Sequence, residues 1–159
     1  MFRPRVIPIL LLKNKGLVKS VKFKDYTYIG DPINAVKIFN DKKADELVFL
    51  DIAASAENRL IPLDFIEKVG DEANMPFAVG GGIKSIQDIR QVLKAGAEKV
   101  IINTHALENP IFIREAADIF GSSTIVVSID VKKNLFGKEQ IFKLNGKKST
   151  GYDPISFAK

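Results

Sequence analysis

The 159-residue sequence has no cysteine, no tryptophan and a single histidine, His105. A chain without cysteine forms neither disulfides nor thiolate metal sites, and it has no cysteine nucleophile. A single histidine also excludes a histidine-rich metal centre. We therefore expect no metal and no cofactor, and the missing cysteines fit a cytoplasmic protein.

Long hydrophobic runs are also absent. No apolar run reaches the roughly 18 residues that span a bilayer, and the first residues lack the cleavage region of a signal peptide. The net charge of +5 is spread over the sequence, apart from a lysine cluster between positions 132 and 148. Nucleic-acid binding usually needs a compact basic stripe with aromatic residues. We therefore expect neither nucleic acid nor membrane as a partner, whereas an anionic phosphorylated metabolite would benefit from the positive field.

Apolar residues, which make up 46% of the chain, suffice for one domain with a hydrophobic core. Apolar runs of four to eight residues alternate with helical patterns, which predicts repeated βα units around a parallel sheet. The predicted strands are 6–12, 46–51, 76–79, 99–103 and 124–131, and the predicted helices are 32–42, 62–73, 86–95 and 110–120. Three helix starts share an Asp or Asn cap followed by proline, at Asp31, Asn109 and Asp153.

The chain repeats one motif at long range. Gly30-Asp31-Pro32-Ile33 is matched 122 positions later by Tyr152-Asp153-Pro154-Ile155. This offset spans four βα units and indicates a duplicated half-barrel, with 1–121 as the first half and 122–159 as the start of the second. An eight-unit (β/α)8 barrel needs about 250 residues. We expect an α/β chain holding the first four and a half units of a single, C-terminally truncated TIM barrel domain, whose open edges favour self-association.

A triple glycine, Gly80-Gly81-Gly82, separates a predicted strand from a helix that begins with the capping-box pattern Ser85 to Asp88. Glycines at such a place bring backbone amides close to a ligand, and a helix N-terminus favours an anion. Asn103 and Thr104 end the neighbouring strand, so their side chains would face the same anion. These residues predict a phosphate site, and the alternative is a tight βα turn without a ligand.

Carboxylates end two other apolar strands, at Asp51 and Asp130. Each is a candidate general acid or base if burial raises its pKa, or else a helix cap or an ion-pair partner of a neighbouring lysine. His105 either touches a ligand or lies on the rim of the site, and we favour the rim. The segment 16–24 alternates apolar and basic residues, which predicts an extended, mobile loop over the barrel mouth. Its Lys19 would clamp a phosphate or be solvated.

Six segments together resemble HisF, the cyclase subunit of imidazole glycerol phosphate synthase, a lyase of histidine biosynthesis. They cover essentially the whole chain, in order and with matching spacing. The segments are Arg5-Val6-Ile7-Pro8, Gly30-Asp31-Pro32, Ala44-Asp45-Glu46-Leu47-Val48-Phe49-Leu50-Asp51-Ile52, Val79-Gly80-Gly81-Gly82-Ile83, Lys99-Val100-Ile101-Ile102-Asn103-Thr104 and Val126-Val127-Ser128-Ile129-Asp130.

The resemblance implies a (β/α)8 barrel that takes ammonia from a glutaminase subunit at its N-terminal face. The ammonia is used on a bis-phosphorylated ribosyl substrate at the opposite face. By similarity, the residues with roles are Gly81, Gly82, Asn103 and Thr104 at one substrate phosphate, Asp130 as one of two catalytic aspartates, Lys19 in the flexible first loop, and Arg5, Glu46 and Lys99 around the ammonia entrance.

The sequence departs from the family at the end of the first strand, where Leu11 occupies the place of the other catalytic aspartate. Leucine neither accepts a proton nor stabilises a cation, so the acid–base pair is broken. This resembles a HisF-like branch associated with sugar amidation in surface-polysaccharide synthesis, which relays ammonia to a separate amidotransferase. Two alternatives stay open. One is a genuine histidine-pathway cyclase in which another group replaces the aspartate, and the other is a non-catalytic half-barrel that self-associates.

Overall fold

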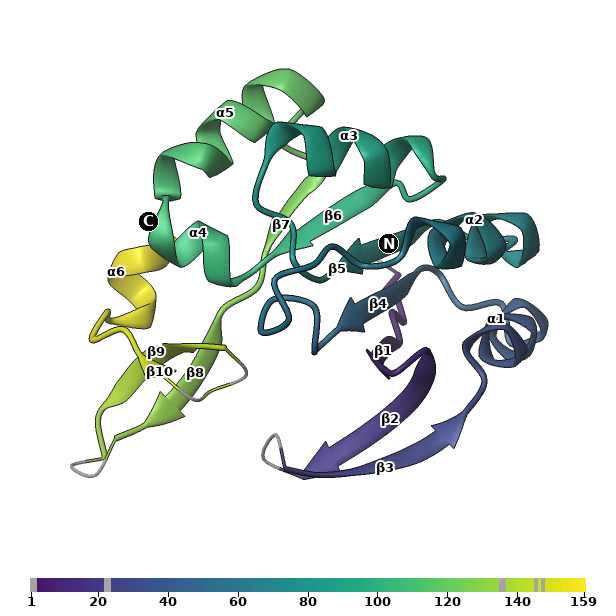
Figure 1. Ribbon diagram of the computed structural model, residues 1–159, viewed down its shortest axis with the longest axis horizontal. Helices are drawn as coiled ribbons and strands as arrows, with labels where there is room; N and C mark the ends of the chain where they lie inside the picture. The colour runs from purple at the N-terminus through teal and green to yellow at the C-terminus, as the bar shows by residue number, and fades with distance from the viewer. Residues whose placement is uncertain (1–2, 22–23, 135–136, 145, 147) are drawn as a thin grey trace.

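The computed structural model describes residues 3–21, 24–134, 137–144, 146 and 148–159. A curved sheet forms its centre, and five strands of this sheet run parallel in the order β1, β4, β5, β6 and β7 (Figure 1). Their bounds are Ile9–Lys13 for β1, Leu47–Asp51 for β4, Phe77–Gly80 for β5, Lys99–Ile102 for β6 and Ile125–Val127 for β7. The parallel order confirms the predicted α/β class, as a partial (β/α)8 barrel.

Four helices cover one side of this sheet (Figure 1). They are α1 (Pro32–Asp41), α2 (Leu63–Glu72), α3 (Ile86–Lys94) and α5 (Pro110–Phe120). The bounds of each helix lie within one residue of the predicted ones, because the apolar periodicity marks the extent of each helix clearly. Two short helices complete the set, α4 (Thr104–Glu108) and α6 (Pro154–Ala158). None of the helices in the described ranges has the length and apolar character that a membrane span requires.

Side chains alternate between the two faces of the sheet, as they must in a strand. Phe49, Val79 and Val100 belong to the main core between the sheet and the helices. The opposite face carries a small cluster of Val48, Ala78 and Ile101. The barrel axis of a complete barrel would lie on this second face.

Two hairpins project from the end of the molecule where the parallel strands finish (Figure 1). The first consists of β2 (Gly16–Val21) and β3 (Lys24–Gly30), and the second sheet consists of β8 (Asp130–Lys133), β9 (Glu139–Lys143) and β10 (Lys148–Ser149). Each precedes a helix with the Asp-Pro start. Asp31 accepts a hydrogen bond from the Asn34 amide at 2.9 Å, and Asp153 accepts one from the Ser156 amide at 2.9 Å. The long-range motif thus adopts the same local structure twice.

Three expectations from the sequence need correction. The predicted strand 124–131 is two strands, since β8 leaves the parallel sheet and pairs with β9. Asn109 makes no side-chain capping bond to α5. The described residues of the segment 16–24 form β2 and the first position of β3 rather than a loop, because Asn14 and Lys15 form a two-residue turn with positive φ that pairs β2 with β1. Positions 22 and 23 of that segment lie outside the described residues, as do 135, 136, 145 and 147 of the lysine cluster.

Candidate functional site

A cavity of about 120 Å³ opens where β4, β5 and β6 end. Seven residues that the sequence singles out at strand ends line it together. They are Leu11, Asp51, Gly81, Gly82, Asn103, Thr104 and Asp130. The carboxyl ends of parallel strands meet at one edge of the sheet, which explains why residues so distant in sequence converge.

The glycine turn packs directly against the loop that follows β4. A Cβ atom at Gly82, where φ is +71°, would lie 1.8 Å from the carbonyl oxygen of Arg59. One residue earlier, the amide of Ile61 donates a hydrogen bond to the carbonyl of Gly81 at 3.0 Å. Only glycine fits at position 82 without displacing this loop. The conformation of the turn therefore depends on where residues 59–61 are held.

The capping box at the start of α3 is present as predicted. The Asp88 amide donates to Ser85 Oγ at 3.0 Å, and the Lys84 and Ser85 amides donate to Asp88 Oδ2 at 3.0 and 2.9 Å. The Asp88 carboxylate thus occupies two amides that precede the helix. An anion at this turn would depend on the glycine segment and on the end of β6 more than on those two amides.

Asn103 and Thr104 follow β6 beside the glycine turn. Asn103 Nδ2 donates to the Ser128 carbonyl at 2.9 Å, which ties the end of β6 to the segment after β7. Thr104 Oγ1 lies 3.4 Å from Asn103 Oδ1. Thr104 is also the first residue of α4, a helix that was not predicted from the sequence. His105 is half-buried in the wall of the same cavity, with its ring 4.8 Å from that of Phe112.

Asp51 is buried, with 8% of its surface exposed, and its carboxylate is well paired. Arg59 bridges both carboxylate oxygens, with Nη1 at 2.6 Å from Oδ2 and Nη2 at 3.3 Å from Oδ1. The amides of Ala53 and Ala54 also donate to Asp51 Oδ1, at 3.0 and 3.1 Å. The partner is therefore an arginine and two backbone amides, where the sequence analysis considered a lysine. The hydrogen bond to Asp51 is the main cause that raises the pKa of Arg59.

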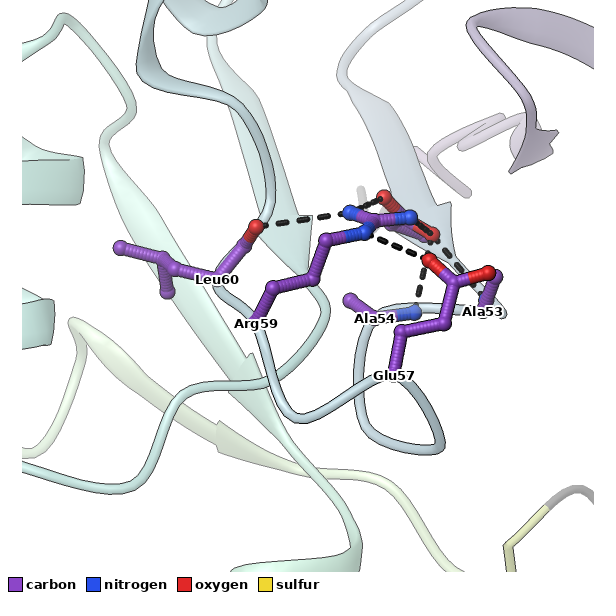
Figure 2. A network of polar contacts seen from close by, with 6 residues as sticks. Ala53, Ala54, Glu57, Arg59 and Leu60 are labelled. Atoms are coloured by element: carbon purple, nitrogen blue, oxygen red, sulfur yellow. Dashed lines mark hydrogen bonds and ion pairs between the residues drawn. The ribbon is translucent and has the colours of Figure 1, made fainter.

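Arg59 also reaches two neighbours in its own loop (Figure 2). Its Nε lies 2.7 Å from Glu57 Oε2, and its Nη1 lies 3.4 Å from the Leu60 carbonyl. Sequence reasoning missed this residue. One signal was available: Arg59 is the single arginine between Asp51, which ends β4, and the start of α2.

Asp130 and Leu11 also line this cavity. Burial raises the pKa of Asp130, against the opposing effects of the Lys132 charge and the Asn103 side chain. Leu11 is half-buried in the middle of β1, not at its end as predicted, because the strand continues to Lys13, and it pairs in register with Leu50 of β4. The cavity thus contains Asp130, whose pKa is raised, and Asp51, which is paired with Arg59, whereas Leu11 contributes an aliphatic side chain.

The remaining predicted site residues lie outside this cavity. Lys19 is exposed on β2 of the first hairpin. At the opposite end of the sheet, Glu46 is buried with 4% of its surface exposed. Its carboxylate contacts Lys99 Nζ at 2.6 Å and Arg5 Nη1 at 3.4 Å. The structure therefore brings Arg5, Glu46 and Lys99 together as one charged group, separate from the cavity.

Residues 5–159 match the protein family described as "Histidine biosynthesis protein". The chain is 48% identical over 159 residues to "Imidazole glycerol phosphate synthase subunit HisF" of Oceanobacillus iheyensis, covering all of this chain and 63% of the relative. It is 43% identical over 178 aligned positions to the protein of the same name from Methanocaldococcus jannaschii, covering all of this chain and 65% of the relative. The chain thus spans less than two thirds of the length of these curated relatives.

Proposed function

The chain belongs to the HisF group of the histidine biosynthesis family, and on this basis we propose that it is the synthase subunit of a glutamine-dependent amidotransferase system. In this role it receives ammonia from a glutaminase subunit and relays or uses it in the amidation of a phosphorylated sugar-type substrate. Surface-polysaccharide synthesis is the proposed setting. The observation that carries the proposal is Leu11 in the wall of the cavity.

Leu11 lines the cavity that also contains Asp130. Acid–base chemistry on a bound substrate commonly uses two titratable groups whose environments set their pKa values apart. With leucine at position 11 of β1, Asp130 has no carboxylate counterpart there, and a cyclisation that needs both groups would be impaired. Ammonia transfer through the barrel makes no such demand on Leu11.

The cluster of Arg5, Glu46 and Lys99 supports the ammonia role. Burying a carboxylate with its cations carries a desolvation cost that well-packed apolar residues would avoid, and this favours a role for the cluster beyond stability. Its place at the amino-terminal end of β4 and β6 is opposite the cavity. A glutaminase that docks at this end would deliver ammonia past Glu46 toward the strand ends.

The phosphate role rests on Gly81, Gly82, Asn103 and Thr104. Backbone amides of a glycine turn and neutral side-chain donors are well suited to a phosphate group. All four residues line the cavity. We propose that they hold a phosphate of the substrate and that Lys19, on the adjacent hairpin, approaches it from outside.

The ammonia role is tested by mixing the chain with a HisH-type glutaminase and measuring glutamate release. We expect faster release than from the glutaminase alone, and a loss of this stimulation in Lys99→Met. Lys133→Met, which changes an exposed lysine in the second sheet, serves as the control. Stimulation that is absent from the unmodified chain, or that is equal in Lys99→Met, would contradict the role.

A second candidate is a genuine cyclase of histidine biosynthesis, and the identity to relatives named as HisF subunits favours it. In that case another group takes the part of the missing aspartate. Complementation of a cyclase-deficient strain distinguishes the two candidates, because growth without histidine requires cyclisation. Growth of the same strain with the Leu11→Asp variant shows whether an aspartate at this position increases cyclisation.

The domain organisation is part of the proposal. We assign residues 1–159 to one partial barrel domain, with 1–121 as a first half-barrel and 122–159 as the start of a second. Support comes from the equivalent capping bonds of Asp31 and Asp153 and from the antiparallel strands that precede each.

A further inference from the structure

The ion pair between Arg59 and Asp51 joins the two surfaces against which the glycine turn is packed. On one side, a Cβ at Gly81 would lie 2.8 Å from Asp51 Cβ. On the other, the Arg59 carbonyl occupies the space beside Gly82, and the Ile61 amide holds the Gly81 carbonyl. The turn is thus enclosed between the end of β4 and the loop 52–61.

From this arrangement we infer that Arg59 is a positioning residue for the phosphate-binding turn. Its guanidinium binds both carboxylate oxygens of Asp51 as a fork, and this fork fixes the loop 52–61 that packs against Gly81 and Gly82. The inference rests on the proposed phosphate role of that turn. Arg59 acts through the turn and not on the ligand, because its guanidinium is directed at Asp51, Glu57 and the Leu60 carbonyl (Figure 2).

The fork has a geometry that lysine cannot reproduce. Two guanidinium nitrogens bind the two oxygens of Asp51, so both the distance and the angle between β4 and the loop are set. The Leu60 carbonyl, at 3.4 Å from Nη1, links the same group to the backbone beside Gly82. A lysine would keep the charge but lose the fork.

Charge is the second part of the role. Asp51 lines the cavity in which the anion is proposed to bind, and it is buried there. An unpaired carboxylate at that place would repel a phosphate, more strongly than in water because the site is partly desolvated. Arg59 neutralises this carboxylate through its two contacts with the Asp51 oxygens, at 2.6 and 3.3 Å.

The test is a titration of the 159-residue chain with inorganic phosphate, followed by the amide NMR signals of Gly81 and Gly82. We expect Arg59→Gln to raise the dissociation constant for phosphate roughly tenfold. This is the low end of the loss in affinity caused by removing residues that support the ligands of metal sites. Arg59→Lys should raise it about threefold, because it retains the charge alone. Hydrogen exchange at the Ile61 amide should become faster in Arg59→Gln without any ligand, which reports the turn directly.

Two controls separate this role from a general loss of charge or contact. Glu57→Gln removes the negative charge of Glu57, a partner of Arg59 whose own side chain is 35% exposed while that of Glu57 is 52% exposed. This variant leaves the fork between Arg59 and Asp51 in place. Arg114→Gln removes one positive charge from an exposed position of α5. Both variants should bind phosphate as the unmodified chain does.

The outcomes distinguish the two proposals. If the unmodified chain binds phosphate and Arg59→Gln binds it equally well, the positioning role is wrong while the phosphate site stands. If the unmodified chain binds no phosphate, the phosphate site is wrong and the role of Arg59 falls with it. Should Arg59→Gln fail to fold, Arg59→Lys decides, and affinity equal to that of the unmodified chain would overturn the inference.

Discussion

Among the glycines of the chain, Gly82 has the least room for a side chain. An added Cβ would lie 1.8 Å from the Arg59 carbonyl, and φ is +71°. Gly121 has φ of +89° but nothing within 4 Å of an added Cβ, so it isolates the dihedral cost. We expect Gly121→Ala to lower the free energy of unfolding by about 1 kcal/mol, and Gly82→Ala by about 3 kcal/mol or more, because the backbone must also move. Urea denaturation of both variants measures the difference, and equal losses would contradict the steric account.

Asp130 gives a prediction about pH. Burial raises its pKa above the ordinary value of 3.8, so the folded protein holds this proton more tightly than the unfolded chain does. The stabilisation is complete below the unfolded pKa and is lost as pH rises through the folded pKa. Asp130→Asn should therefore gain stability relative to the unmodified chain between about pH 3 and pH 7. Urea denaturation across this range, with the exposed Asp118→Asn as control, checks the sign, and a falling difference would contradict it.

Site residues could be predicted from the sequence where their position follows from the order of the strands in the sheet. Gly82, Asn103 and Asp130 follow the neighbouring parallel strands β5, β6 and β7 by one to three residues, so their convergence follows once these strands are known. Arg59 was missed because the path of an irregular loop decides which strand end it reaches. The pairing of Asp51 with an arginine could not be read from spacing alone.

At the scale of elements, the two Asx-Pro helix starts of α1 and α5 differ in a measurable way. Asp31 accepts a bond from the Asn34 amide at 2.9 Å, whereas Asn109 makes no side-chain capping bond. We expect Asp31→Ala to lower the free energy of unfolding by about 1 kcal/mol and Asn109→Ala to lower it by less than about half of that. Equal losses in thermal or urea denaturation would show that the capping bond is not the cause.

The main strands and helices could be predicted because buried parallel strands and amphipathic helices leave strong apolar patterns. The first hairpin was interpreted as a loop, although the alternation of apolar and basic residues in 16–24 is itself the pattern of a strand with one exposed face. The split between β7 and β8 was missed because one apolar run, 124–131, continues through the point where the chain leaves the sheet. Pairing partners, which a single segment does not encode, decide such cases.

At the scale of the whole molecule, apolar side chains on the face opposite the helices are exposed. Ile9, in register with Val48, is 62% exposed, and Val126, in register with Ile101, is 37% exposed. An apolar sheet face with open edges favours association. This favours the self-associating half-barrel as a state of the isolated 159-residue chain.

We therefore predict that this chain sediments as a dimer or larger species, in a concentration-dependent way. Ile9→Lys with Val126→Lys should shift it toward the monomer, because a charged side chain resists burial. Ile111→Lys changes a residue of α5 that is 77% exposed and serves as the control. A chain that stays monomeric at all concentrations would rule out this mode of association.

We propose that this HisF-family chain supports ammonia production but lacks a complete acid–base pair for cyclisation. One reaction measures both, with the chain, a HisH-type glutaminase, glutamine and the histidine-pathway substrate, followed by assays of glutamate and of the cyclised product. We predict glutamate release above that of the glutaminase alone, with cyclised product no higher than in the same reaction with Asp130→Asn. Cyclised product clearly above that background, formed with Leu11 in place, would contradict the claim.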